Sequence, residues 1–512
     1  MDFTSLARLF LERRARRFDS WTGKEVEVQE AQLRSLLRSA CTTAFGREHS
    51  FNDILSSSDL CSSYSEAVAA EGYESFRPYV MRMTDGEPDV LWPGICNNFA
   101  QSSGTSGGRS KFIPITRESL RLNHYAGASD VVASYLHLNP ASRMFSGKGF
   151  ILGGSFESQL VPKNPRAKVG DLSATLIDSV SPLVNLFRVP DKKTALMADW
   201  SEKLEMLALK ASKANITNIS GVPSWFLRVL QRVLEITGKP DIHRVWPSLE
   251  VFFHGGVSFE PYRAEYSAIC RQTDDNLPAM NFFETYNASE GFFAVQADLL
   301  PGHRPMRLLL DIGIYYEFAP LDDENKIIGV SGLEVGRVYE LIISACNGLW
   351  RYRIGDTVQV ESVSPLLITI AGRTRSFINA FGEEVMEHNA EEAVGAACSE
   401  TGAKIINYTV APIYSRDGKR GSHQWIIEWS KEPEDTSLFR DILDRALCNA
   451  NSDYAAKRNG SIFLDPPVIV SVPSGSFDYW LSHTSSGKLG GQRKIPRLNN
   501  DRRIADQILG SI

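Results

Sequence analysis

Residues 101–111 read Gln-Ser-Ser-Gly-Thr-Ser-Gly-Gly-Arg-Ser-Lys, and this stretch decides how the rest of the chain is interpreted. Glycines leave the backbone free to curl with its N–H groups facing inward, while hydroxyl and basic side chains add further donors. The composition therefore predicts a cradle for a polyphosphate. It is neither a Walker A loop nor a Gly-x-Gly-x-x-Gly fingerprint, and a flexible Gly/Ser loop is the alternative. The residues assigned to the cradle are Ser102, Ser103, Gly104, Thr105 and Ser106.

Two later segments strengthen the prediction. Residues 281–291 read Asn-Phe-Phe-Glu-Thr-Tyr-Asn-Ala-Ser-Glu-Gly, and residues 350–356 read Trp-Arg-Tyr-Arg-Ile-Gly-Asp. The order and the residues of the three segments resemble the motifs of the adenylate-forming superfamily. More closely, they resemble the Gretchen Hagen family of acyl acid amido synthetases, whose phosphate motif is similar to Ser102–Gly108 followed by Lys111–Pro114.

This resemblance implies a site for ATP and Mg²⁺. Tyr286 matches the family's aromatic residue against the adenine, and Asp356 matches the carboxylate that holds the ribose hydroxyls. Glu290 matches the acidic residue that binds Mg²⁺, and we count it among the catalytic residues. Gly255 and Gly256 follow an expected strand and would let the backbone approach the adenine edge. The alternatives are that Tyr286 is a core aromatic residue, that Glu290 is a turn carboxylate and that Asp356 is an ordinary hairpin aspartate.

The C-terminal part offers two candidates for the lysine that catalyses adenylation. General adenylate-forming enzymes end with Gly-Lys, which would indicate Lys488. The amido synthetases end with Gln-x-Lys-x-Pro-Arg, which matches residues 492–497 over a longer stretch and favours Lys494. Upstream, Arg373 belongs to a Gly-Arg-Thr-Arg segment that resembles the hinge before the small mobile domain of such enzymes, and we include it in the nucleotide site.

Length and composition bound the remaining possibilities. A chain of 512 residues is expected to form two or three domains. The formal net charge of −6 argues against a nucleic-acid binder or a basic membrane-surface protein. Seven scattered cysteines without a Cys-x-x-Cys pair argue against disulfides and structural zinc. We expect a cytoplasmic protein, monomeric rather than oligomeric, whose N-terminal Phe3, Leu6 and Phe10 mark an amphipathic helix docked on the body rather than a transit peptide.

The pattern along the chain predicts an α/β fold. We expect a large N-terminal domain over residues 1–372, with mainly parallel sheets, helices and a β-rich antiparallel subdomain. A hinge follows at 373–375, and then a small mobile α+β domain at 376–512. Helices are predicted over 116–132 and from Pro223 to just before Gly238. Strands are predicted at 216–219, 249–253, 307–318, 337–344, 351–360, 405–410, 424–429 and 468–472.

The segment between residues 150 and 280 should line an acyl pocket, and it is the part that departs most from the family. Val222, Trp225 and Phe226 begin the helix there and are our candidates for substrate contact, although apolar helix residues also form cores. The leading function is an ATP-dependent ligase that activates a carboxylic acid as acyl-AMP and transfers it to an amino acid. An acyl-CoA ligase and an inactive nucleotide-binding scaffold are the alternatives.

Overall fold

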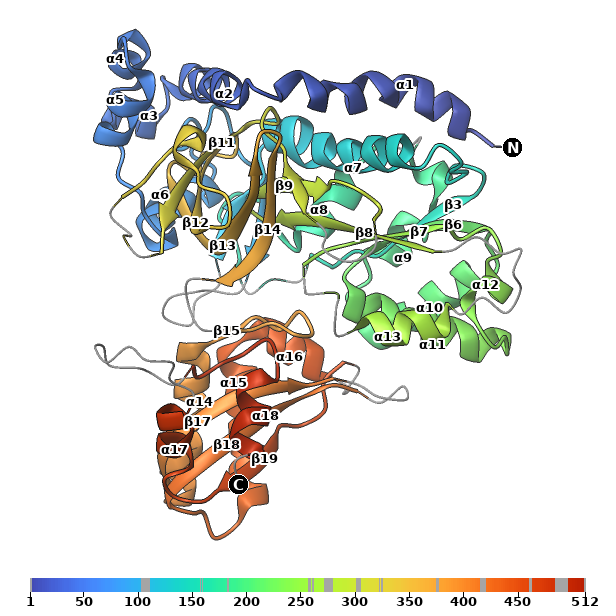
Figure 1. The fold of residues 1–512 in the computed structure, drawn as a ribbon, viewed down its shortest axis with the longest axis vertical. Coiled ribbons are helices and arrows are strands. Elements are labelled where there is room, and N and C mark those ends of the chain that lie inside the picture. Colours follow the sequence, from blue (N-terminus) through green and yellow to red (C-terminus); the bar gives the residue numbers. More distant parts are fainter. Residues whose placement is uncertain are drawn as a thin grey trace.

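A computed structural model describes the chain in fifteen ranges and single residues. These are 2–102, 111–156, 158, 160–181, 184–256, 259, 262–270, 280–300, 305–321, 323, 326–373, 377–414, 420–459, 463–483 and 496–510. Figure 1 shows a large upper body from residue 2 to about residue 373 and a smaller C-terminal body beneath it.

Helices cover the upper side of the large body (Figure 1). Helix α1 packs on α7, and a buried carboxylate between them explains why. Asp130 of α7 accepts hydrogen bonds from Arg14 Nε at 2.5 Å and from Arg17. The bounds of the N-terminal elements are α1 Thr4–Arg16, η1 Arg17–Trp21, α2 Glu25–Ala40, α3 Ala44–Glu48, α4 Phe51–Ser56, α5 Leu60–Ala67 and α6 Tyr73–Thr84.

The docking of α1 is confirmed, but the apolar positions that predicted it face outward. Leu6 is 52 % exposed and Phe10 is 73 % exposed, while the basic side of the helix meets the body. The need to neutralise Asp130 determines the docked face, because a carboxylate buried without cations would be costly. Arg17 Nε also lies 3.0 Å from Oδ2 of Asp311, which lies between β10 and β11 and whose pKa burial raises to about 6.

One mixed sheet of eleven strands forms the centre of the described large body. Its order is β11-β12-β13-β14-β10-β9-β8-β7-β6-β3-β5. Neighbours from β8 to β5 run parallel, and those from β8 to β11 run antiparallel. The bounds are β3 Lys148–Ile151, β5 Arg188–Val189, β6 Ile216–Gly221, β7 Val251–His254, β8 Asn281–Ala288, β9 Gly291–Gln296, β10 Met306–Leu308, β11 Ile314–Pro320, β12 Val338–Ala345, β13 Tyr352–Val363 and β14 Leu366–Arg373.

The α/β class is therefore confirmed, with one refinement. The β-rich region that the sequence suggested as a subdomain continues the same sheet, because β10 pairs with both β9 and β14. A second described sheet of three strands, in the order β2-β1-β4, carries the ends of the glycine-rich loop. Its strands are β1 Asn98–Ser102, β2 Lys111–Pro114 and β4 Lys168–Gly170.

The helices around the sheet follow their sequence signals. After β2, the Thr116 hydroxyl caps the start of the next helix by accepting a hydrogen bond from Ser119 N at 2.9 Å. A π-helical segment, η2, then leads into α7. Helix α11 begins at Pro223 and ends before Gly238, whose φ of +63° suits glycine. The bounds are η2 Ser119–His124, α7 Tyr125–Leu138, α8 Leu172–Ser179, η3 Val184–Phe187, α9 Lys192–Ala195, α10 Trp200–Ser212, α11 Pro223–Thr237, α12 Ile242–Val245, α13 Arg263–Ile269 and η5 Val330–Gly332.

The C-terminal body has an α+β arrangement. Strands β17, β18 and β19 form a sheet in that order, with β17 antiparallel and β19 parallel to β18. Within the described chain, no helix is long and apolar enough to cross a bilayer. The bounds are β15 Phe377–Ile378, β16 Val385–Met386, α14 Glu387–Thr401, β17 Lys404–Ile413, β18 Ser422–Lys431, α15 Thr436–Ala450, α16 Ser452–Arg458, β19 Val468–Val472, α17 Ser476–His483 and α18 Arg503–Leu509.

Candidate active site

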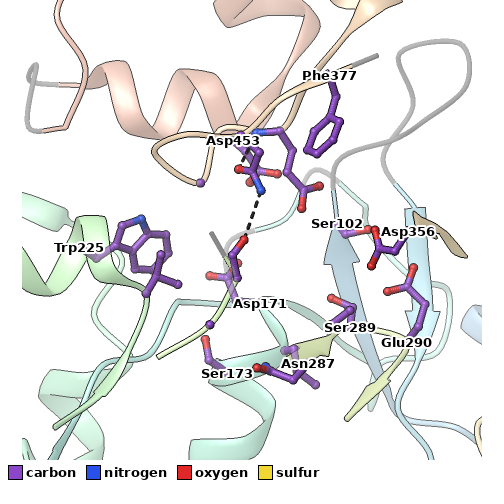
Figure 2. A pocket seen from close by; sticks show the side chains of 18 of the residues that line it. Ser102, Asp171, Ser173, Trp225, Asn287, Ser289, Glu290, Asp356, Phe377 and Asp453 are labelled. Carbon is purple, nitrogen blue, oxygen red and sulfur yellow. Dashed lines mark hydrogen bonds between the residues drawn. The ribbon is translucent and has the colours of Figure 1, made fainter. Parts of the chain in front are cut away.

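A cavity of about 940 Å³ lies where the two bodies meet, and both supply its walls. Figure 2 shows Ser102, Glu290 and Asp356 on one side and Trp225 on the opposite side, with Asp453 of the C-terminal body above. The cavity is therefore elongated, and its two ends carry different chemistry.

At the first end, Tyr286 and Asp356 form a buried pair. The Tyr286 hydroxyl donates to Asp356 Oδ2 at 2.7 Å, and Asp356 is only 6 % exposed. The two residues sit on β8 and β13, strands that the mixed sheet brings to one edge of the cavity. A carboxylate there can accept from two neighbouring hydroxyls, which is the requirement for holding a ribose.

Glu290 lies in the tight turn between β8 and β9, yet it lines the cavity and is only 7 % exposed. Tyr352 donates to its Oε1 at 3.4 Å, and Lys111 Nζ donates to the Tyr352 hydroxyl at 3.2 Å. The Asn347 amide donates to the Glu290 backbone carbonyl at 3.0 Å and fixes the turn. Glu290 is thus a turn carboxylate, as the alternative supposed, and it is also held inside the cavity.

The glycine-rich loop departs from this end of the cavity. Ser102 lines the cavity and pairs with Lys111 across the antiparallel strands β1 and β2, so the base of the loop is closed. Ser103, Gly104, Thr105 and Ser106 lie outside the described residues. Their assignment to the polyphosphate remains a prediction, supported by the position of the two residues that bound the loop.

Gly255 and Gly256 follow β7 and line the same cavity. A Cβ on Gly255 would lie 2.4 Å from the carbonyl oxygen of Thr285, so only glycine lets this loop approach β8 so closely. Gly256 has a φ of +85°, which also favours glycine. The two glycines keep the wall thin next to Tyr286, where the sequence places the adenine.

The opposite end of the cavity is built by helix starts. Val222 and Trp225, our candidates for substrate contact, line it. Phe226 does not: its side chain is fully buried and packs against Phe150 and Phe252 in the core. The prediction of substrate contact is therefore wrong for Phe226. Successive helix residues point about 100° apart, so residues 225 and 226 cannot both face the cavity.

Two further lining residues here, Asp171 and Ser173, escaped the sequence analysis because no motif surrounds them. Ser155 N donates to Asp171 Oδ2 at 2.7 Å, and Gly154 N donates to the Ser173 hydroxyl at 2.8 Å. Lys203, whose pKa burial lowers to about 8, donates to the carbonyls of Gly153 and Gly154 and holds this turn. The Gly-Gly turn was the only available signal.

The C-terminal body adds residues that the sequence did not single out either. Phe377, Glu384, Tyr414, Asp453 and Lys457 line the cavity from above. Arg373 ends β14, where its backbone pairs with that of Asp356, and its side chain is outside the described part. Lys488 and Lys494 lie outside the described residues as well, so the choice between them stays a prediction.

Family models match three parts of the chain. They are described as the GH3 family N-terminal domain at residues 14–274, the GH3 family central domain at 307–373 and the GH3 family C-terminal domain at 388–503. The largest match alone covers more than half of the 512 residues, because it spans 261 of them.

Among curated proteins, the chain is 23 % identical to indole-3-acetic acid-amido synthetase GH3.4 of Arabidopsis thaliana over 92 % of this chain and 88 % of that protein. It is 23 % identical to jasmonoyl--L-amino acid synthetase GH3.5 of Oryza sativa subsp. japonica over 94 % of each chain. Among solved structures, AtGH3.15 acyl acid amido synthetase in complex with 2,4-DB superposes with a TM-score of 0.60 and 18 % identity, covering 96 % of this chain and 95 % of that one. At this identity, the superposition establishes a shared fold.

Proposed function

Because the chain belongs to the GH3 family, we propose that it is an ATP-dependent acyl acid amido synthetase, which joins a carboxylic acid to an amino acid through an acyl-adenylate. The two curated relatives named above are synthetases, and this chain matches each of them over nearly its whole length. The observation that carries the proposal is the meeting of Asp356, Tyr286 and Glu290 at one end of a cavity with a separate wall at its other end.

The reaction has two steps. First, a carboxylate oxygen of the acid bonds to the α-phosphorus of ATP, and the bond from that phosphorus to the pyrophosphate oxygen breaks. Second, the amine nitrogen bonds to the activated carbonyl carbon, the bond from that carbon to the AMP oxygen breaks, and the amine loses a proton. The two steps together replace hydroxide, a poor leaving group, with AMP.

The residues present fit ATP. Asp356 and Tyr286 offer a carboxylate and a ring to the ribose and the adenine, and Gly255 and Gly256 leave room for the base. Ser102 and Lys111 stand where the polyphosphate would enter the glycine-rich loop. A pocket of this volume is large enough for a nucleotide together with a small acid.

Glu290 fits Mg²⁺, which typically takes one or two protein carboxylates and completes its shell with phosphate oxygens and water. In the described residues no cluster of three metal-ligating side chains exists, which agrees with that sparse mode of binding. Mg²⁺ bound there would supply positive charge beside the phosphates. Glu290 would hold the metal in place, because Tyr352 positions its carboxylate and Asn347 fixes its turn.

At the other end, Val222 and the indole of Trp225 offer apolar surface to the body of the acid. We propose an acid with an apolar or aromatic body, whose reactive carboxylate points toward Glu290 and the phosphates. The identity of the acid is open to a screen.

The proposal is tested by incubating the protein with Mg·ATP and a panel of acids while pyrophosphate release is followed. With an active acid and no amine, we expect ATP–pyrophosphate exchange, because adenylation is reversible. Adding amino acids one at a time should release AMP and amide in equal amounts, measured by mass spectrometry. Rapid thioester formation with coenzyme A, and no amide with any amino acid, would instead make the chain an acyl-CoA ligase.

A further inference from the structure

Lys457 is a buried cation that crosses from one body to the other. It lies in the last turn of α16 in the C-terminal body, is only 4 % exposed, and lines the cavity. Its Nζ sits 3.8 Å from the centroid of the Trp225 ring, which belongs to the large body. A cation over an indole face is held by the ring quadrupole, so the ammonium has a defined position.

The chain leaves space for this contact. A Cβ on Gly382 would lie 3.3 Å from both Lys457 Cε and Trp225 Nε1, and Gly382 has a φ of +87°. The ring of Phe463 also lies near the ammonium, with its centroid 5.9 Å away. The lysine stem is therefore packed, and only the end of the side chain is available to the cavity.

Within the described residues, the Lys457 ammonium has neither a hydrogen-bond acceptor nor an ion-pair partner within reach. Asp453, Asp171, Glu383 and Glu384 act on it only through longer-range attraction, while burial lowers its pKa. A buried charge without a partner costs folding free energy, and such a group calls for a functional explanation. The explanation with the least cost is an anion that arrives with a substrate.

An anion bound by Lys457 would lie at a different position from the phosphates of ATP. Figure 2 shows Trp225 across the cavity from Ser102, Glu290 and Asp356, where the phosphates would be held. The reactive carboxylate of the acid must also lie near those phosphates in the first step. A carboxylate at the Trp225 end is therefore a second one, carried by the acceptor or by a dicarboxylic acid.

The surrounding charges distinguish these two sources. Asp171 and Asp453 also line the cavity, so a second anionic arm on the acid would meet repulsion as well as attraction. An amino acid brings an ammonium two bonds from its carboxylate, and the neighbouring carboxylates can accept hydrogen bonds from that ammonium. A cation set among carboxylates matches the charge pattern of a zwitterion.

We propose that Lys457, held over the indole of Trp225, binds the α-carboxylate of the acceptor amino acid. This inference rests on the proposed amide-forming function and names the residue that selects amino acids over simple amines. Because Lys457 belongs to the C-terminal body and Trp225 to the large body, the acceptor site is complete only when the two bodies meet as they do here.

The experiment compares Lys457→Met, which keeps an apolar stem, with the exposed surface control Lys404→Met on β17. ATP–pyrophosphate exchange reports the first step, and amide formation is measured with an amino acid and with its carboxamide, which lacks the carboxylate charge. For Lys457→Met we expect the KM for the amino acid to rise about 10- to 150-fold, as loss of a charged hydrogen bond implies. The wild-type preference for the amino acid over its carboxamide should disappear, and Lys404→Met should behave as wild type.

Three results would overturn the inference. An equal rise in KM for the amino acid and its carboxamide would show that Lys457 only supports the fold. A rise in the KM for the acid in the exchange reaction would assign the lysine to the acid. If Lys457→Met still preferred the amino acid over its carboxamide, Lys457 would have no role in recognising the acceptor.

Two further arms keep the outcomes separate. If Lys457→Met does not fold, Lys457→Arg restores the cation, and it must restore the preference for the amino acid if the inference holds. If the wild-type protein forms acyl-adenylate but no amide, the proposed function fails first. Amide formation by wild type, with unchanged selectivity in the variant, is the failure of this inference alone.

Discussion

Asp356 performs two tasks at the residue scale. Its Oδ2 accepts from Tyr286, which fixes the ring of that residue, and its carboxylate lines the cavity where a ribose fits. The tyrosine contact needs only a hydrogen-bond acceptor at this position, and a neutral amide could also supply one. The ribose contact that we propose would require the carboxylate itself.

We therefore predict that Asp356→Ala weakens ATP binding by about 1.5–3 kcal/mol, the value of hydrogen bonds to a charged group. Tyr286→Phe is the matched control, because it removes the partner hydroxyl and leaves the carboxylate, and it should cost less. Calorimetric titration with a non-hydrolysable ATP analogue measures both. Equal affinity in Asp356→Ala and wild type would place the nucleotide elsewhere.

Asp311 gives a prediction about pH. Burial raises its pKa to about 6 from 3.8, and its Oδ1 is buried without a hydrogen-bond partner among the described residues. The folded state thus binds the Asp311 proton more tightly than the unfolded state. The resulting cost is absent below pH 3.8, grows as the pH rises toward 6, and is complete above it.

Asp311→Asn should accordingly raise the free energy of unfolding at pH 7.5 by about 1–2 kcal/mol, since one pKa unit corresponds to about 1.4 kcal/mol and the site is partly solvated. Arg17 keeps its other partner, Asp130. Urea unfolding at pH 7.5 and near pH 4 measures the difference, which should disappear at the lower pH. A difference that is the same at both values would contradict the titration argument.

At this scale the sequence predicted residues that lie within recognisable motifs. Tyr286, Glu290 and Asp356 meet at one end of the cavity. Arg351 and Arg353, from the same motif as Asp356, instead form ion pairs with Glu317 and Glu340. Asp171, Ser173 and Lys457 could not be predicted. Each reaches the cavity through packing between segments far apart in sequence, and local pattern carries no record of such meetings.

At the scale of elements, α7 and β9 approach through a glycine. A Cβ on Gly127 would lie 2.4 Å from Cγ of Phe292, close to the base of a rigid ring that cannot turn aside. Gly127 is therefore required by packing, although glycine is a poor residue for the middle of a helix.

We predict opposite signs for two glycine substitutions in helices. Gly127→Ala should lower the free energy of unfolding by about 1–3 kcal/mol through overpacking. Gly395→Ala in α14, where nothing lies within 4 Å of the new Cβ, should raise it by about 0.5–1 kcal/mol. Thermal unfolding of the two variants decides, and a stabilising Gly127→Ala would refute the close approach.

Elements were predicted well where turn and cap residues bound them. Helix α11 begins at its proline and ends at its glycine, and β19 covers the predicted residues 468–472. What the pattern could not give was the surface that each face meets. Leu6, Leu9 and Phe10 of α1 point to solvent because Asp130 attracts the basic face. Phe226 turns into the core one residue after Trp225 turns out of it.

At the scale of the whole molecule, we expect the C-terminal body to deliver the lysine of the adenylation step. The segment after it is anchored to that body: Thr409 donates to the Pro496 carbonyl at 2.7 Å, and Leu498 bridges to Val410. Lys494 precedes this anchor by two residues, so we propose that movement of the whole body, rather than of a loop alone, brings it to the ATP.

Lys494→Ala should reduce adenylate formation by about 10²–10³-fold, the effect of removing one preorganised donor to a developing charge, with ATP affinity nearly unchanged. ATP–pyrophosphate exchange and calorimetry measure the two quantities. Lys488→Ala is the control and should matter less. A larger loss of exchange in Lys488→Ala would reverse the choice between the two lysines.

The two ends of the cavity differ in how they are tied to the sheet. Tyr286 and Asp356 lie within β8 and β13, each hydrogen-bonded to a strand on both sides, whereas Val222 and Trp225 follow the end of β6. Backbone changes at the first end break ladder bonds, while changes at the second break none. Natural variation can therefore accumulate where the acid binds while the nucleotide end is inherited intact, and one ancestral scaffold can give rise to descendants that activate different acids.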